Sequence, residues 1–159
     1  MRYIIAFLAL AGVVVASLAL RVHYSTGTEP CSINEHWDCG IVNHSSYATV
    51  KGIFWHIAAN RHPDSTSGRA PRDGFPVAAV GVIGYALILL VALLRLRWLN
   101  LLLALGGFAC ALYLSNIEAH VLEVWCLYCV ISQGIIALIA LLSVAWVAVH
   151  ATNKRRVRP

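Results

Sequence analysis

Cysteines are the residues of this 159-residue chain best suited to carry out chemistry. Cys126 and Cys129 form a C-x-x-C motif, in which two intervening residues bring the sulfur atoms close enough to form a disulfide. The motif opens a predicted helix, and the partial positive charge of a helix N-terminus stabilises a thiolate at the first cysteine. A thiol with a larger thiolate fraction exchanges disulfides faster. We therefore predict that Cys126 and Cys129 are a redox-active pair.

A second cysteine pair, Cys31 and Cys39, lies in a long polar segment between two apolar stretches. A disulfide exchange between the two pairs would carry two electrons from the water-exposed loop toward the lipid phase. A quinone is the natural membrane-dissolved acceptor of two electrons, since the cofactor supplies the difficult redox chemistry. The fifth cysteine, Cys110, lies midway along a predicted apolar helix, and there we expect a small buried apolar residue.

Two other uses of the cysteines remain open. Cys31 and Cys39 could form a structural disulfide in a non-enzymatic membrane protein, because disulfides are common in loops on the oxidising side. All four paired cysteines could instead bind one zinc ion, although the spacing of Cys31 and Cys39 is not the usual second C-x-x-C knuckle. We expect the redox use, and no metal.

The composition predicts an all-α membrane protein made of a single domain, residues 1–159. Hydrophobic residues make up 60% of the chain and charged residues only 12%, whereas soluble domains are about a quarter charged. A bilayer-spanning helix needs about 20 apolar residues. We predict four such helices, an outer loop and a basic cytoplasmic tail, at residues 3–20, 76–94, 98–117 and 125–149, at 21–75 and at 150–159. No A-x-A cleavage site follows the first stretch, so we expect it to be retained.

Basic residues predict the orientation of these helices. Lysine and arginine concentrate on the cytoplasmic side of membrane proteins. Four spans place both termini and the turn between the second and third helices on that side, with the cysteine pairs on the outer, oxidising side. The net charge of +5 does not indicate a nucleic-acid partner, because the basic residues lie at segment ends and in the tail. They are Arg2, Arg95, Arg97, Lys154, Arg155, Arg156 and Arg158.

The outer loop contains a predicted short amphipathic helix. Apolar residues follow Ser45 and Ser46 at spacings of three and four, which is typical of a helix with one apolar face. We expect a serine cap at its start and expect the helix to lie against the membrane surface. The apolar positions are Tyr47, Val50, Ile53, Phe54 and Ile57.

The order of these elements resembles the vitamin K epoxide reductase family, including bacterial members that reoxidise disulfide-forming proteins. The resemblance covers nearly the whole chain. It rests on Cys31-x7-Cys39 after the first helix, on Ser45 six residues after Cys39, and on three further spans. The motif Trp125-Cys126-Leu127-Tyr128-Cys129, which opens the last span, completes it. DsbB-type enzymes do similar chemistry, but their C-x-x-C lies in the first outer loop.

The resemblance implies a role for each cysteine. Cys129 would react with a quinone such as menaquinone, phylloquinone or ubiquinone. Cys126 would form an interchange disulfide with Cys39, and Cys31 would meet a separate thioredoxin-like (DsbA-type) partner on the outer side. The membrane would be a bacterial inner membrane. Ser45 matches a family serine or threonine near the active site, although it could equally be the helix cap.

Two positions depart from the animal members of that family. Gln133 stands where they carry a tyrosine, and Val77 stands near an expected asparagine. Both changes favour plain quinone reduction over epoxide reduction. Gln133 could hydrogen-bond a quinone oxygen or only another helix. Three outer-end residues could relay protons or could simply be solvated: Glu118, His120 and Glu123.

Overall fold

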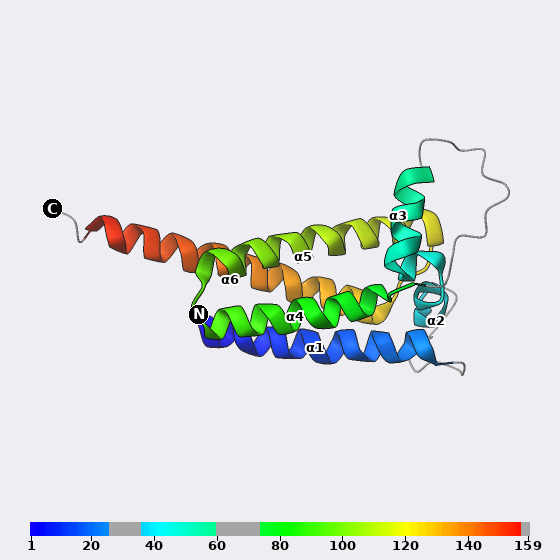
Figure 1. Ribbon diagram of the computed structural model, residues 1–159, viewed down its shortest axis with the longest axis horizontal. Helices are drawn as coiled ribbons and strands as arrows, with labels where there is room; N and C mark the ends of the chain where they lie inside the picture. Colours follow the sequence, from blue (N-terminus) through cyan, green and yellow to red (C-terminus); the bar gives the residue numbers. More distant parts are fainter. Residues whose placement is uncertain (26–35, 60–73, 157–159) are drawn as a thin grey trace.

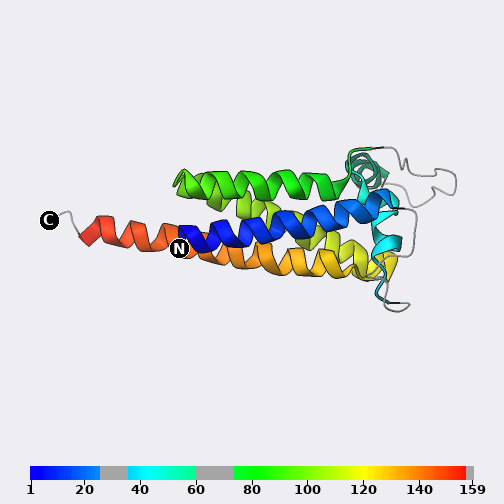
Figure 2. The same cartoon turned by 90° about the horizontal axis from the view of Figure 1, so that it is seen from below.

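The computed structural model describes residues 1–25, 36–59 and 74–156, which are helical apart from two isolated β-bridges. Four long helices run side by side along the long axis of the molecule (Figures 1 and 2). Short elements cluster at one end of this bundle. In chain order, the elements are α1 (Arg2–Tyr24), α2 (Cys39–Asn43), η1 (Ser46–Ala48), α3 (Val50–Ala59), α4 (Val77–Leu93), α5 (Arg97–Ile117), the π-helix η2 (Glu118–Leu122) and α6 (Leu127–Arg156).

Helix α1 shows how the bundle is packed. Small residues recur along one face and are buried, which lets neighbouring backbones approach closely. Gly12 lies so close to the Tyr85 ring of α4 that an added Cβ would come within 2.4 Å of it. Large apolar residues recur along the opposite face of α1 and are exposed, as expected for contact with lipid. The buried residues include Ala6, Ala9, Gly12, Ala16 and Ala19, and the exposed ones Tyr3, Phe7, Leu10, Val14 and Leu18.

The helices form a closed ring of contacts, in which α1 packs on α4 and α6, and α5 packs on α4 and α6. Polar contacts also join helices within the apolar interior, both across the ring from α4 to α6 and between the neighbours α5 and α6. The Tyr85 hydroxyl donates to the Ser132 carbonyl of α6 at 2.8 Å, and the Asn100 amide of α5 donates to the Ser143 hydroxyl of α6 at 2.7 Å. Interhelical hydrogen bonds of this kind fix how helices are rotated against one another.

Three of the described helices are long and apolar enough to cross a membrane: α1, the continuous stretch Arg97–Leu122, and Leu127–Thr152 of α6. Helix α4 has 17 residues and is shorter, although it packs within the same bundle. The prediction of an all-helical membrane protein is therefore confirmed by helix length and composition. The count of four spans stays a prediction.

Two helices extend beyond the predicted spans. Helix α1 continues past Leu20 to Tyr24 because residues 21–24 contain no glycine or proline, and the Ser25 hydroxyl then donates to the Val22 carbonyl. Helix α6 continues to Arg156, into the segment that we predicted as a tail. No helix breaker precedes Arg156, and Figure 1 shows these last turns extending beyond the rest of the bundle.

The outer loop contains a helix that begins later than expected, and its amphipathic contact with the membrane surface stays a prediction. Helix α3 starts at Val50 and crosses the end of the bundle at a steep angle to the long helices (Figure 1). The Thr49 hydroxyl accepts the Gly52 N–H at 3.2 Å, so Thr49 provides the helix cap. The prediction of a serine cap was wrong, because the Ser45 hydroxyl donates to the Val42 carbonyl instead. Residues 60–73 of the predicted outer loop lie outside the described residues.

Candidate functional site

Two short backbone segments hold the cysteine-bearing elements together. Trp37 and Trp125 form an isolated parallel bridge. The Trp125 N–H donates to the His36 carbonyl at 2.8 Å, and the Asp38 N–H donates to the Trp125 carbonyl at 3.1 Å. A cysteine follows each side of this bridge, Cys39 two residues after Trp37 and Cys126 directly after Trp125. The bridge therefore sets the register between two cysteines that lie 87 positions apart in the chain.

Cys39 and Cys126 are both fully buried, with 0% of each side chain exposed. They belong to one apolar cluster with Val22 and Val42, against which Cys129 also packs. Because neither Cys39 nor Cys126 is exposed to water, a disulfide exchange between them is protected from competing thiols in solution. The predicted interchange pair is thus brought into one dry cluster.

Asn43 connects these two cysteines. Its amide nitrogen donates to the Cys39 carbonyl at 2.9 Å and to the Cys126 sulfur at 3.6 Å. Only 6% of Asn43 is exposed, so both bonds lie inside the protein. Asn43 was not predicted from the sequence, because an asparagine near the end of a loop helix usually indicates only a helix terminator.

Cys126 occupies the N-cap position of α6. Its carbonyl accepts the Val130 N–H at 3.0 Å, which is the first bond of the helix, and its sulfur accepts the Cys129 N–H at 3.4 Å. The sulfur thus takes the place that a serine or aspartate oxygen usually fills. The hydrogen bond with the Cys129 side chain lowers the pKa of the Cys126 thiol by more than burial raises it. The Cys129 N–H and the Asn43 amide act in the same direction.

The cysteines are in two oxidation states. Cys39 is disulfide-bonded, whereas Cys126 and Cys129 are free thiols. Cys31, with which we predicted that Cys39 pairs, lies outside the described residues. A sulfur held in a disulfide is not available as a thiolate ligand, which weighs against the four-cysteine zinc site. The described part of the chain contains no cluster of three or more metal-binding side chains.

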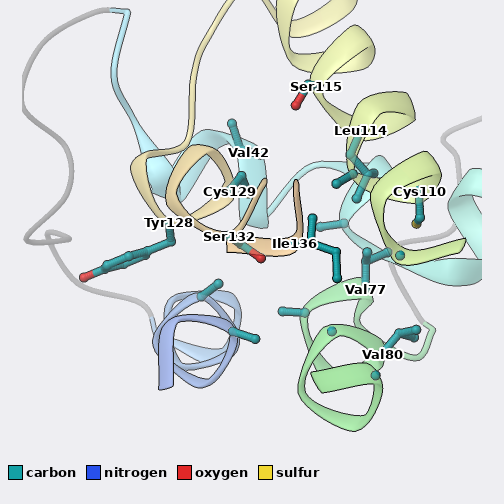
Figure 3. A pocket seen from close by; sticks show the side chains of 18 of the residues that line it. Val42, Val77, Val80, Cys110, Leu114, Ser115, Tyr128, Cys129, Ser132 and Ile136 are labelled. Atoms are coloured by element: carbon teal, nitrogen blue, oxygen red, sulfur yellow. The ribbon is translucent and has the colours of Figure 1, made fainter. Parts of the chain in front are cut away.

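A cavity of about 460 Å³ begins beside Cys129 and runs into the bundle (Figure 3). Figure 3 shows its labelled residues coming from α2, α4, α5 and α6. Its walls are mostly apolar, with a few polar groups at the end near the cysteines, as is typical of small-molecule sites. Those polar residues include Asn43, Ser45, Tyr47, Ser115, Glu118 and Ser132.

A family model described as the vitamin K epoxide reductase family matches residues 3–144 of the chain. The chain belongs to the vitamin K epoxide reductase family. This match includes three of the long helices almost entirely, the first part of α6 and all five cysteines, and it supports a membrane oxidoreductase that acts on quinones. No curated protein matched the chain.

The other site residues predicted from the sequence lie in different places. Ser45 lines the cavity, as does Cys110, which is exposed to that space rather than buried as we expected. Gln133 is not among the lining residues. It accepts a hydrogen bond from Ser115, which does line the cavity. A quinone contact by Gln133 therefore stays a prediction for this family member.

Two glycine pairs shape the same cavity. Sequence patterns of this kind usually indicate close helix packing, but a Cβ added at Gly84 or at Gly106 would meet nothing within 4 Å. Both glycines line the cavity, so their missing side chains leave it open. By contrast, Gly107 packs against Ile136 and Gly81 against Ala16.

The hydrogen bonds at the α6 N-terminus predict how the Cys126 thiol titrates. In a variant with Cys31, Cys39 and Cys110 changed to serine, only Cys126 and Cys129 contribute thiolate absorbance. We expect the first ionisation at a pH below that of an ordinary thiol, and we expect Cys129→Ala to move the pKa of Cys126 upward. The sign follows from linkage. A thiol with a lowered folded-state pKa stabilises the fold above its unfolded pKa, and that stabilisation is lost as pH falls through the folded value.

Asn43→Ala supplies the graded comparison, with a smaller upward shift than Cys129→Ala because it removes a lesser cause of the lowered pKa. An unchanged titration in the Cys129→Ala protein would contradict the assignment of Cys126 as the stabilised thiolate.

Proposed function

We propose that this protein is a membrane thiol:quinone oxidoreductase that supports disulfide formation. The observation that carries the proposal is the burial of Cys39 and Cys126 in one cluster, at the mouth of a cavity that Cys129 lines. This arrangement connects a disulfide in the loop to a thiol pair and the thiol pair to a hydrophobic binding space. Neither a structural disulfide nor a scaffold role requires such a sequence of contacts.

Electrons enter through the loop pair. A reduced thioredoxin-like (DsbA-type) partner on the outer side attacks the Cys31–Cys39 disulfide with a thiolate, leaves as a disulfide and delivers two electrons. The freed Cys39 thiolate attacks Cys126 in an oxidised Cys126–Cys129 pair, which breaks that disulfide and releases Cys129 as a thiolate. Cys31 then attacks Cys39 in the new Cys39–Cys126 bond. This restores the loop disulfide and leaves both helix cysteines reduced.

That final arrangement matches the oxidation states in the structure, with Cys39 in a disulfide and with Cys126 and Cys129 as thiols. The reduced pair then gives two electrons to the quinone and closes again as a disulfide. A low pKa suits Cys126 to this exchange, because it makes Cys126 a good leaving group when Cys31 resolves the interchange bond.

The shape of the cavity supports a quinone with a long apolar tail. Its lining runs along α5 from Leu102 to Ile117, which is about 22 Å at the rise of an α-helix. The polar residues lie at the Cys129 end, where a quinone ring would bind, and Leu102, Leu103 and Ile88 lie toward the other end. The residues match the chemistry of menaquinone, phylloquinone or ubiquinone alike. Gln133 accepts a hydrogen bond from Ser115 and so positions this polar residue of the cavity wall beside the quinone ring.

We place the cysteines on the outer face of a bacterial inner membrane, with four spans and both termini in the cytoplasm. The basic residues at the chain ends and in the α4–α5 turn support this orientation. The short elements α2, η1 and α3 then form a cap over the cavity, and Phe54 and Trp55 of α3 reach the lipid headgroups with their exposed rings.

Quinone reduction by the purified protein tests the function directly. With a reduced thioredoxin-like dithiol as donor, quinone absorbance should fall catalytically in detergent. Cys129→Ala should abolish turnover, because it removes the thiol nearest the quinone. Ser17→Ala, an exposed substitution on α1, should leave the rate unchanged. Absence of turnover by the unmodified protein with several quinones would contradict the proposal.

Filling the cavity tests where the quinone binds. Gly84→Leu places a side chain into open space within the cavity, so kcat/KM for the quinone should fall about tenfold or more, which corresponds to about 1.4 kcal/mol. Gly134→Leu makes the same change at an exposed position of α6 and should have little effect. Stoichiometric oxidation of the dithiol without quinone should survive in both variants. Equal quinone kinetics in the two would place the binding site elsewhere.

A further inference from the structure

Glu118 is a buried carboxylic acid that the relay described above does not use. Only 3% of it is exposed, in a protein where buried acids are rare unless they are partnered. It lines the quinone cavity together with Cys129. Burying an acid inside a membrane protein is expensive, and such acids often belong to proton or substrate pathways.

The contacts of Glu118 point at both reacting cysteines. One carboxylate oxygen, Oε2, accepts the Cys126 N–H at 3.3 Å. The carboxyl group also interacts electrostatically with the Cys129 side chain. Glu118 is therefore an acid that neighbours both reacting cysteines and also borders the space where the quinone ring would bind.

The backbone around Glu118 is specialised for this placement. The α-helix ends at Ile117, and Glu118 opens a five-residue π-helix, a form that is rare and is found mainly at functional sites. The π-helix stops at Glu123, which adopts a left-handed backbone conformation with φ of 54°. Non-glycine residues seldom adopt this conformation. The wider turn aims Glu118 back toward Cys126, whereas Glu123 is exposed to solvent.

We propose that Glu118 is a catalytic residue that carries a proton from the Cys129 thiol to the quinone. This inference rests on the proposed function. The Glu118 carboxylate takes the Cys129 proton as the sulfur gives up electrons, and the resulting acid then donates that proton to a quinone oxygen. General acid–base catalysis of this kind contributes about 10²- to 10⁴-fold to a rate.

The atoms and electrons balance over the step. The Cys129 thiol and the Cys126 thiolate lose two electrons and one proton as the Cys126–Cys129 bond forms, and the quinone gains two electrons and two protons to become a quinol. Glu118 carries the proton from Cys129 and ends as the carboxylate it was at the start. Cys126 has already lost its proton, because it leaves the interchange bond as a thiolate, and the second proton of the quinol comes from water. The groups that face the Glu118 carboxyl group are the Cys126 N–H and the Cys129 thiol.

Glu118→Gln separates proton transfer from structure, because glutamine keeps the shape and an oxygen that accepts the Cys126 N–H. We expect kcat for quinone reduction to fall about 100-fold, with little change in KM for the quinone. One ionisation should disappear from the pH profile of kcat. Glu118→Asp, which retains a carboxyl group, should recover part of the rate. Glu123→Gln makes the same change at the exposed neighbour and should behave as the unmodified protein does.

A second readout distinguishes this inference from the proposed function. Stoichiometric oxidation of the dithiol by the oxidised protein without quinone needs only disulfide exchange, so Glu118→Gln should perform it at the normal rate. If the unmodified protein reduces quinone and Glu118→Gln does so equally well with the same pH profile, the inference is overturned and the function stands. If Glu118→Gln also loses the stoichiometric oxidation, Glu118 has a structural role and the inference is overturned as well. If the unmodified protein reduces no quinone, the function itself fails.

Discussion

The pairing of Trp37 with Trp125 is the constraint on which the site depends. A bridge of only two residues joins the loop to the start of α6, and each side of it leads into a helix that begins at or next to a cysteine. The Asp38 carboxylate caps α2 by accepting the Gly40 N–H at 2.7 Å, and the Cys126 sulfur caps α6. Because both caps are fixed, Cys39 and Cys126 are held in register without any covalent bond between them. Asn43 completes the junction by reaching from one to the other.

A membrane bundle makes this junction useful. The long helices pack through small residues and direct large apolar side chains outward. Few large side chains therefore point inward to fill the space near Cys129. Glycines on α4 and α5 leave that space open, and it extends from the buried thiols into the apolar middle of the bundle. In the relay that we propose, water-soluble and lipid-soluble reactants would therefore approach the two cysteine pairs from different directions. Separation of this kind allows a disulfide relay to run without direct contact between its two substrates.

Much of this arrangement is predictable from the sequence, and the limits have physical reasons. Long apolar stretches predict helices well, because a helix in lipid must satisfy its own backbone hydrogen bonds. The C-x-x-C at Cys126 likewise indicates a redox pair with an activated first thiol. Helix ends were less predictable, since Arg21–Tyr24 and residues 150–156 continue their helices where hydropathy alone suggests a stop. The cap of α3 was misassigned because Ser45 and Thr49 are both good caps, and only tertiary contacts select Thr49.

The features that could not be predicted from the sequence depend on contacts between segments far apart in the chain. Nothing local in His36–Asp38 or Trp125 marks a β-bridge, and Asn43 lies far from Cys126 in the chain. Glu118 was recognised as an ionisable residue near the outer end, but its burial depends on the π-helical turn that places it inside the protein. Gly84 and Gly106 follow a packing pattern and instead border a cavity, since spacing alone cannot show whether a neighbouring helix is present.

Trapping the interchange bond between Cys39 and Cys126 tests the central claim most directly. In a Cys129→Ala, Cys110→Ala protein, the partner thiol of Cys126 is removed, so the bond that Cys126 makes with the loop persists. Mass spectrometry of a non-reduced digest identifies the linked peptides. The account predicts a Cys39–Cys126 disulfide that is lost on reduction. A Cys31–Cys126 disulfide in its place would contradict the account and reverse the roles of the two loop cysteines.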